Sequence, residues 1–179
     1  NYFAKFKIGN DSAEVAFVVM ADPNYKMSQA EYEAQFELLQ KIQDKYNVVQ
    51  KTVKDIRTLR TQINDFVGRQ KDMPKEIKAM ADSVVKKLTG LEEKLHQTKA
   101  KSSQDVLNFP IRLNDKISGL FDVVNSGKMP PSKQAGEVFQ DLSQQADAVI
   151  KAYKDVLNAE IPQFNKMIRE QALPVIGLK

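Results

Sequence analysis

The spacing of apolar residues changes once along the chain, from every second position to every third or fourth. Residues 2–8 alternate between apolar and polar side chains, the pattern of a half-buried strand, with apolar positions at Tyr2, Ala4, Phe6 and Ile8. A turn composition over residues 9–12 and a β-rich run over residues 13–20 follow. This pattern predicts a β-hairpin. Because a two-stranded hairpin is marginal in water, it needs either helices or further strands as support, and we favour a sheet whose other strands lie upstream.

Helical spacing begins shortly after Pro23, which ends the strand region because its ring fixes the backbone. Ser28 and Glu31 have the spacing of a capping box, in which each side chain bonds the backbone amide of the other residue, and they predict the start of a helix. The apolar positions of this long first helix are Tyr32, Phe36, Leu39, Ile42, Tyr46, Val49, Val53, Ile56, Leu59, Ile63 and Phe66.

A second helix is predicted to open near Asp72 and Pro74, with Asp72 as N-cap and the proline in the first turn. Its apolar positions are Ile77, Met80, Val84, Leu88, Leu91 and Leu95. Periodicity is lost over residues 97–108, which predicts a connector with room for one short helical turn.

Two more helices are predicted after this connector. Pro110 introduces the third, which is expected to end near Gly127 and has apolar positions at Leu113, Ile117, Leu120 and Val124. The fourth begins near Ser132, and Pro162 should kink it because proline removes one helical hydrogen bond. Its apolar positions are Val138, Leu142, Ala146, Val149, Tyr153, Val156, Ile161, Phe164 and Ile168.

Helix lengths favour one arrangement of these elements. At 1.5 Å per residue the first and fourth helices are each about 60 Å long, whereas the second and third are about 35 and 25 Å. The sequence therefore predicts an all-α antiparallel bundle preceded by a hairpin. We prefer a three-layer bundle in which the second and third helices form a broken middle rod, with a four-helix up-down bundle as the alternative.

Composition limits the classes of function. The chain of 179 residues has no cysteine, a formal net charge of +4 and 42% hydrophobic residues, so it is of globular type, without a disulfide framework or a thiolate metal site. Basic and acidic residues alternate, which gives no electrostatic case for nucleic acid, and no apolar run approaches the roughly 20 residues of a membrane span. The chain opens on Asn1 without a signal segment, and we expect it to be part of a longer protein.

Residues capable of chemistry are few, and the sequence predicts no catalytic, cofactor-binding or metal-binding site. His96 is the single histidine and is expected to be exposed and inert, which excludes motifs built on two histidines. Glu92 and Glu93 are expected on a solvated face, like Glu31, Glu33 and Glu37. A supporting catalytic role for Glu92 or Glu93 is the alternative.

A basic run on the first helix, Lys51, Lys54, Arg57 and Arg60, has two interpretations. It is either a phosphate-binding strip or, as we prefer, a structural feature in which Arg57 and Arg60 pair with acidic residues of the next helix. The aromatic residues fall on or beside the apolar stripes and are expected in the core: Tyr32, Phe36, Phe66, Phe121, Phe139, Tyr153 and Phe164.

Five stretches taken in order resemble the C-terminal helical region of bacterial proteins named as glycosyl hydrolases with bacterial neuraminidase (BNR) repeats, whose N-terminal part is a sortilin-like β-propeller. The stretches span nearly the whole chain and read VVMADP from Val18, AQFELL from Ala34, IRTLRTQ from Ile56, GLEEKL from Gly90 and FN from Phe164. The chain has Asn24 where the family often has arginine, and Pro131-Ser132 where Pro-Thr is common.

The resemblance implies that residues 1–24 are the last strands of a β-sandwich that follows the propeller, and that residues 25–179 form a helical bundle domain. It implies a non-catalytic scaffold or protein-interaction module, with no cofactor, in an exported protein at the bacterial periplasm or cell surface. The expected partners are the upstream propeller and β-sandwich of the same chain, and possible further partners are other envelope proteins. Self-association through a coiled coil is an alternative suggested by the length of the first stripe.

Overall fold

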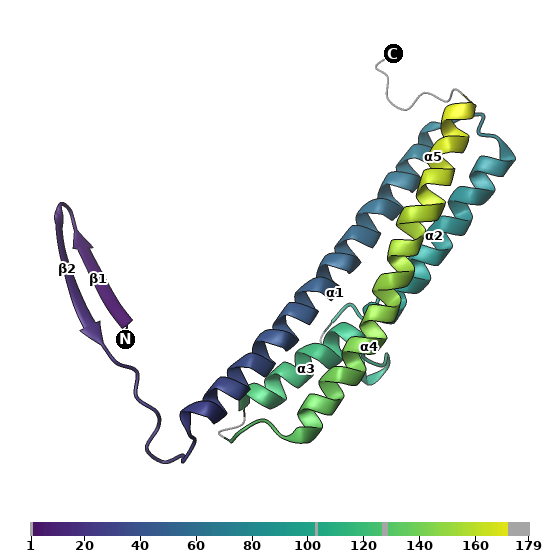
Figure 1. Ribbon diagram of the computed structural model, residues 1–179. Coiled ribbons are helices and arrows are strands. Elements are labelled where there is room, and N and C mark those ends of the chain that lie inside the picture. The colour runs from purple at the N-terminus through teal and green to yellow at the C-terminus, as the bar shows by residue number, and fades with distance from the viewer. Residues whose placement is uncertain (1, 103, 127–128, 172–179) are drawn as a thin grey trace.

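The computed structural model describes residues 2–102, 104–126 and 129–171 and has an all-α bundle preceded by a β-hairpin (Figure 1). The hairpin consists of β1 (Tyr2–Ile8) and β2 (Asp11–Phe17), and the first helix is α1 (Gln29–Arg69). The remaining α-helices are α2 (Lys75–Leu95), α3 (Leu113–Ser126), α4 (Lys133–Asp155) and α5 (Ile161–Glu170). The predicted fold class is confirmed.

Three rods make up the bundle, and the middle one is broken as preferred from the helix lengths (Figure 1). The carbonyl of Val124 near the end of α3 accepts a 2.8 Å bond from Gln35 near the start of α1. Glu92 of α2 instead contacts Arg57 in the C-terminal half of α1. Helices α2 and α3 therefore follow one another, both antiparallel to α1, and α4 and α5 return alongside it (Figure 1).

The capping box that opens α1 is confirmed. Ser28 Oγ accepts from the Glu31 amide at 3.3 Å, and Glu31 Oε2 accepts from the Ser28 amide at 2.7 Å. The Ser28 amide and the Ser28 hydroxyl, which donates to the same Oε2 at 2.8 Å, lower the pKa of the Glu31 carboxyl because both bonds favour its charged form. The start of the long rod is therefore determined by local chemistry in the sequence.

The start of α2 differs from its prediction. Pro74 rather than Asp72 is the N-cap, and no side chain caps this helix. The Pro74 carbonyl accepts the first helical bond, from the Lys78 amide at 3.1 Å, so the helix begins at Lys75. The predicted start of α4 at Ser132 is confirmed, because Ser132 Oγ accepts from the Ala135 amide at 3.1 Å.

The connector between α2 and α3 contains one short 3₁₀ turn, Asp105–Leu107, as expected. Asp105 organises the segment before it by accepting from the amides of Lys101 and Ser102 at 2.6 and 3.0 Å. The two backbone bonds lower the pKa of the Asp105 carboxyl. Gly127, the predicted end of the third helix, lies outside the described residues.

Pro162 interrupts the α-helical pattern but not the rod (Figure 1). A π-helical turn, Val156–Glu160, joins α4 to α5 and places the proline in the first turn of α5. Proline has no amide to donate, and its ring conflicts with the carbonyl four residues earlier. A π turn uses longer hydrogen-bond spacing and accommodates this local change without ending the helix.

The apolar stripes of all the helices meet in one core. Two predicted stripe positions are wrong, because Phe36 is 62% exposed and Val138 is 47% exposed. Phe66 and Phe164 meet edge to face at the α1–α5 end, with ring centroids 6.2 Å apart. The fully buried positions are contributed by both long rods and by the broken middle one, and include Ile42, Val49, Ile56, Val84, Leu88, Leu95, Ile117 and Ala146.

Candidate functional site

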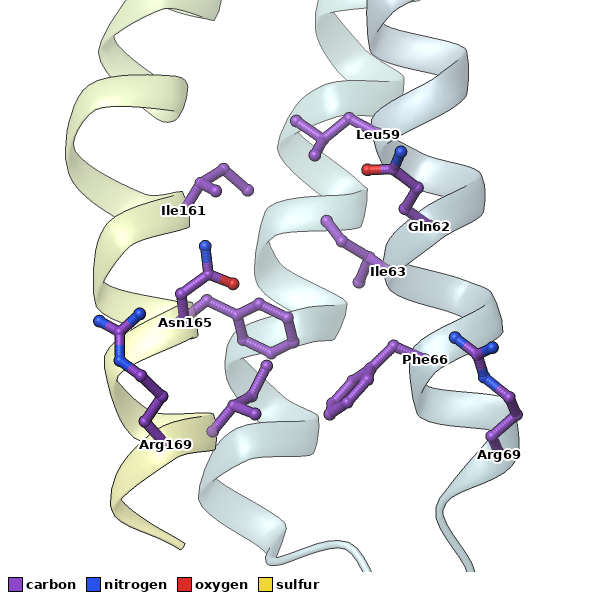
Figure 2. Close-up of a pocket in the computed structure, with 10 residues that line it drawn as sticks. Leu59, Gln62, Ile63, Phe66, Arg69, Ile161, Asn165 and Arg169 are labelled. Carbon is purple, nitrogen blue, oxygen red and sulfur yellow. The ribbon is translucent and has the colours of Figure 1, made fainter. Parts of the chain in front are cut away.

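An apolar groove of about 590 Å³ lies between α1 and α5 (Figure 2). Leu59 and Ile63 line it from α1, and Ile161 and Phe164 line it from α5. All four positions were predicted as core side chains. Ile63 and Phe164 are buried as predicted, whereas Leu59 and Ile161 are only partly buried along the groove. The two walls are about 100 residues apart in the sequence, so no local pattern could have shown the groove.

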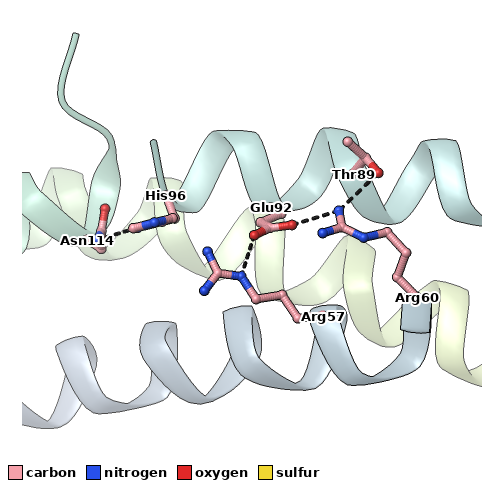
Figure 3. A network of polar contacts seen from close by, with 6 residues as sticks. All are labelled: Arg57, Arg60, Thr89, Glu92, His96 and Asn114. Atoms are coloured by element: carbon pink, nitrogen blue, oxygen red, sulfur yellow. Dashed lines mark hydrogen bonds and ion pairs between the residues drawn. The ribbon is translucent and has the colours of Figure 1, made fainter. Parts of the chain in front are cut away.

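Glu92 occupies the centre of a polar network between α1 and α2 (Figure 3). Its Oε1 accepts a 2.6 Å bond from Arg57 Nε. Its Oε2 lies 2.7 Å from Arg60 Nη1, close enough for an ion pair although the angle does not satisfy hydrogen-bond geometry. Arg60 Nη1 also donates to Thr89 Oγ1 at 3.1 Å. The preferred interpretation of Arg57 and Arg60, pairing with the next helix, is thus confirmed.

The expectation that Glu92 lies on a solvated face is wrong. Glu92 is 1% exposed, whereas Glu93 is exposed as predicted. The signal was available in the sequence, because Glu92 lies four residues after Leu88 and three before Leu95, which is the spacing of the buried face. Both oxygens of Glu92 contact guanidinium groups, and this arrangement supports a structural ion pair rather than an acid or base acting on a ligand.

The expectation that His96 is exposed is also wrong. His96 is half-buried at the C-terminal end of α2, and its Nδ1 lies 3.0 Å from Nδ2 of Asn114 (Figure 3). Asn114 is 3% exposed and is the second residue of α3. This hydrogen bond joins the two halves of the broken rod across the connector. Sequence spacing could not show it, since the connector brings the two residues together.

The other half of the basic run remains on the surface. Lys51 forms an ion pair with Asp55 one turn along α1, which raises the pKa of the Lys51 ammonium, and Lys54 is exposed. Of the aromatic residues expected in the core, Phe66, Tyr153 and Phe164 are buried, and Tyr32, Phe121 and Phe139 are half-buried.

The hairpin exposes an apolar face. Residues opposite one another in an antiparallel pair share a face, and the pairs Tyr2 with Phe17, Ala4 with Val15 and Phe6 with Ala13 all lie on the same one. Phe6 and Val15 are 61% and 57% exposed. In the described part of the chain no helix covers this face (Figure 1), so the predicted half-burial of these strands is not realised there.

The hairpin turn is shorter than predicted, with only Gly9 and Asn10 between the strands. Gly9 has a φ of +60°, the left-handed conformation that a two-residue hairpin turn requires at its first position. The second strand therefore begins at Asp11 and ends at Phe17. The apolar residues that follow, Val18, Val19 and Met20, lie outside the strand and are exposed.

The described residues contain neither a cluster of metal ligands nor a membrane-spanning helix. No group of three or more histidine, aspartate or glutamate side chains has an arrangement suited to a metal ion. No helix among these residues is long and apolar enough to cross a membrane. Comparisons with protein-family models, curated proteins and solved structures gave no match to this chain.

Proposed function

We propose that this chain is a non-catalytic helical module of a larger exported bacterial protein, in which it acts as a scaffold or protein-interaction arm. In this proposal the hairpin completes a β-sandwich that precedes the bundle in the same protein, at the periplasm or cell surface. The resemblance to the helical region of BNR-repeat, sortilin-like propeller proteins suggests this context. The exposed apolar face of the hairpin is the observation that carries the proposal.

The geometry of the hairpin fits this role in two respects. Its apolar face, which includes Tyr2, Phe6 and Val15, is of the kind that packs on a second sheet in a β-sandwich. Its two strands also have unpaired outer edges among the described residues, and such edges accept further strands through backbone hydrogen bonds. The opposite face has the apolar pair Phe3 and Ala16 at one end, and the rest of it is polar, with Lys5 opposite Glu14 and Lys7 opposite Ser12.

The bundle is suited to act as a rigid arm because the helices of this one chain bury their apolar side chains against one another. Side chains of α1 pack on α2, α3 and α4, and Phe66 near its end packs on Phe164 of α5. The apolar stripe that suggested a self-associating coiled coil is thus accounted for by contacts within one chain. A catalytic supporting role for Glu92 has less in its favour, because Arg57 and Arg60 engage its carboxylate.

Hydrogen exchange on two forms of the protein tests the proposal. The first form is the present chain, and the second is extended through the sequence that precedes Asn1 in its gene. We expect amides of residues 2–17 to exchange quickly in the first form and to be strongly protected in the second. Equal, fast exchange in both forms would overturn the proposal, as would the absence of a preceding domain.

A pair of matched variants locates the contact on one face. Phe6→Glu places a charge on the apolar face and should remove the protection of residues 2–17 in the extended protein. Lys7→Glu, the neighbouring position on the polar face, should leave that protection in place. Helical circular dichroism should be unchanged in both variants, because neither residue packs on the bundle.

A further inference from the structure

The groove between α1 and α5 has an apolar floor that extends along both helices (Figure 2). On α1 it runs from Leu59 to the region of Arg69, about 15 Å at the rise of an α-helix. Its volume of about 590 Å³ lies within the range of small-molecule sites, which are mostly apolar with a few polar groups. The apolar lining residues are Leu59, Ile63, Phe66, Ile161, Phe164 and Ile168.

Four polar residues border this floor, and none of them is acidic. Gln62 of α1 and Asn165 of α5 extend toward one another across the groove (Figure 2). Arg69 and Arg169 lie at one end, one on each wall (Figure 2). Neither arginine forms an ion pair within the described residues, and both side chains are exposed. The groove thus combines an apolar channel with positive charge at one end.

We propose that this groove binds one molecule of a free medium-chain carboxylic acid. The acyl chain lies on the apolar floor, and the carboxylate lies at the end that Arg69 and Arg169 border. Arginine suits this task because its planar guanidinium donates paired hydrogen bonds to a carboxylate and remains charged at all physiological pH values. Apolar burial supplies affinity, and the charge selects an anion over a neutral or cationic amphiphile.

The dimensions favour a single extended chain over a docked helix. A helix is about 10–12 Å across with its side chains and buries a stripe several turns long, which a groove about 15 Å long accommodates poorly. An acyl chain is narrow and has apolar surface all around. This inference is independent of the proposed function, since it concerns the far end of the bundle from the hairpin (Figure 1).

Calorimetric titration of the whole chain with sodium decanoate, below its micelle concentration, tests the proposal. We expect one decanoate per chain, with affinity that weakens as salt is added. Acetate shares the carboxylate and decyltrimethylammonium shares the apolar chain, and neither should bind comparably. Equal binding of acetate would overturn the proposal in favour of a simple anion site, and equal binding of the cation would reduce the groove to a nonspecific apolar surface.

Variants assign the binding to this groove. The double substitution Arg69→Gln and Arg169→Gln should raise the dissociation constant by about tenfold or more, as expected for the loss of charge-assisted hydrogen bonds. The matched double substitution Arg112→Gln and Lys116→Gln, at exposed positions outside the groove, should leave it unchanged. Equal effects of the two pairs would show that net charge alone matters and would overturn the assignment.

A variant that fills the groove tests the apolar floor separately from the two arginines. Gln62 is exposed at the border of the groove, so Gln62→Trp fills space without disturbing the core, and circular dichroism checks that the helices are retained. We expect this variant to abolish decanoate binding. Unchanged binding would overturn the proposal. Binding that is detected only after removal of residues 172–179 would also overturn it, by identifying that segment as the occupant.

Discussion

The bundle and the hairpin both carry apolar side chains at regular spacing, but only the bundle buries them. Leu88 of α2 is 0% exposed, whereas Phe6 of β1 is 61% exposed. Each helix of the bundle finds apolar partners within the chain, and the two-stranded sheet finds none among the described residues. The difference teaches that periodicity determines which face of an element is apolar, while the presence of a partner determines whether that face is buried.

A core truncation should give the largest contrast between the two regions. Leu88→Ala removes a fully buried side chain and leaves a cavity, which should lower the free energy of unfolding by about 2–5 kcal/mol. Urea unfolding followed by circular dichroism at the helical band measures this change. Phe6→Ala in the hairpin is the control and should leave the same transition within about 0.5 kcal/mol of its original position. A comparable loss in both variants would show that the hairpin does support the bundle.

Removal of the cations around Glu92 should have the next largest effect. The double substitution Arg57→Met and Arg60→Met leaves a buried carboxylate without its charged partners and should cost about 3 kcal/mol of unfolding free energy. A triple variant that also carries Glu92→Met should recover most of the loss, since it buries apolar groups in place of the ion pairs. Failure of the triple variant to recover would show that the network contributes more than charge compensation.

The capping box allows a smaller test that depends on pH. Ser28→Ala should lower the unfolding free energy by about 1 kcal/mol, because it removes the side-chain acceptor of the N-cap. Hydrogen bonds from Ser28 lower the pKa of Glu31 in the folded state, so the contribution of Glu31 is fully present above the ordinary glutamate pKa and is lost as pH falls through the folded-state value. Denaturation of the original chain and of Glu31→Gln across acidic pH should therefore converge at the lowest pH.

Gly9→Val should have the smallest effect on global stability and the largest on the hairpin. The φ of +60° at Gly9 places a β-branched residue in a left-handed conformation that costs about 1–2 kcal/mol. Apart from Gly9 and its two chain neighbours, no atom lies within 4 Å of the position where a Cβ would be, so the strain comes from the local backbone. Hydrogen exchange of residues 2–17 should accelerate while the unfolding transition of the bundle stays in place. A shift of the unfolding transition would show that the hairpin contributes to the stability of the bundle.

Local signals in the sequence determined the elements of this fold. The Ser28 capping box, the Ser132 N-cap and the stripe from Ile42 to Phe66 each act through neighbours within one or two helical turns, so they are visible without a structure. Helix lengths also favoured a broken middle rod, because two short helices together match one long one. The predicted N-cap at Asp72 was wrong, since the Pro74 carbonyl two residues later accepts the first bond of α2.

The candidate sites depended far more on tertiary contacts. Glu92 occupies a core position by its spacing, yet its charge favoured a surface prediction, and only the proximity of Arg57 and Arg60 compensates its burial. His96 became half-buried because the connector brings it to Asn114. Arg69 and Arg169 border one groove from opposite walls only because α5 packs beside α1.

By itself, the sequence determined where the helices and strands form and which of their faces are apolar, since hydrogen bonding and side-chain periodicity are local properties. The tertiary structure decided how far each of those faces is buried and which particular charges meet, because burial and ion pairing depend on residues distant in the chain. The hairpin illustrates both statements. The alternation of apolar and polar side chains over the seven residues of β1 predicted the strand and its apolar face. That face has no partner among the described residues.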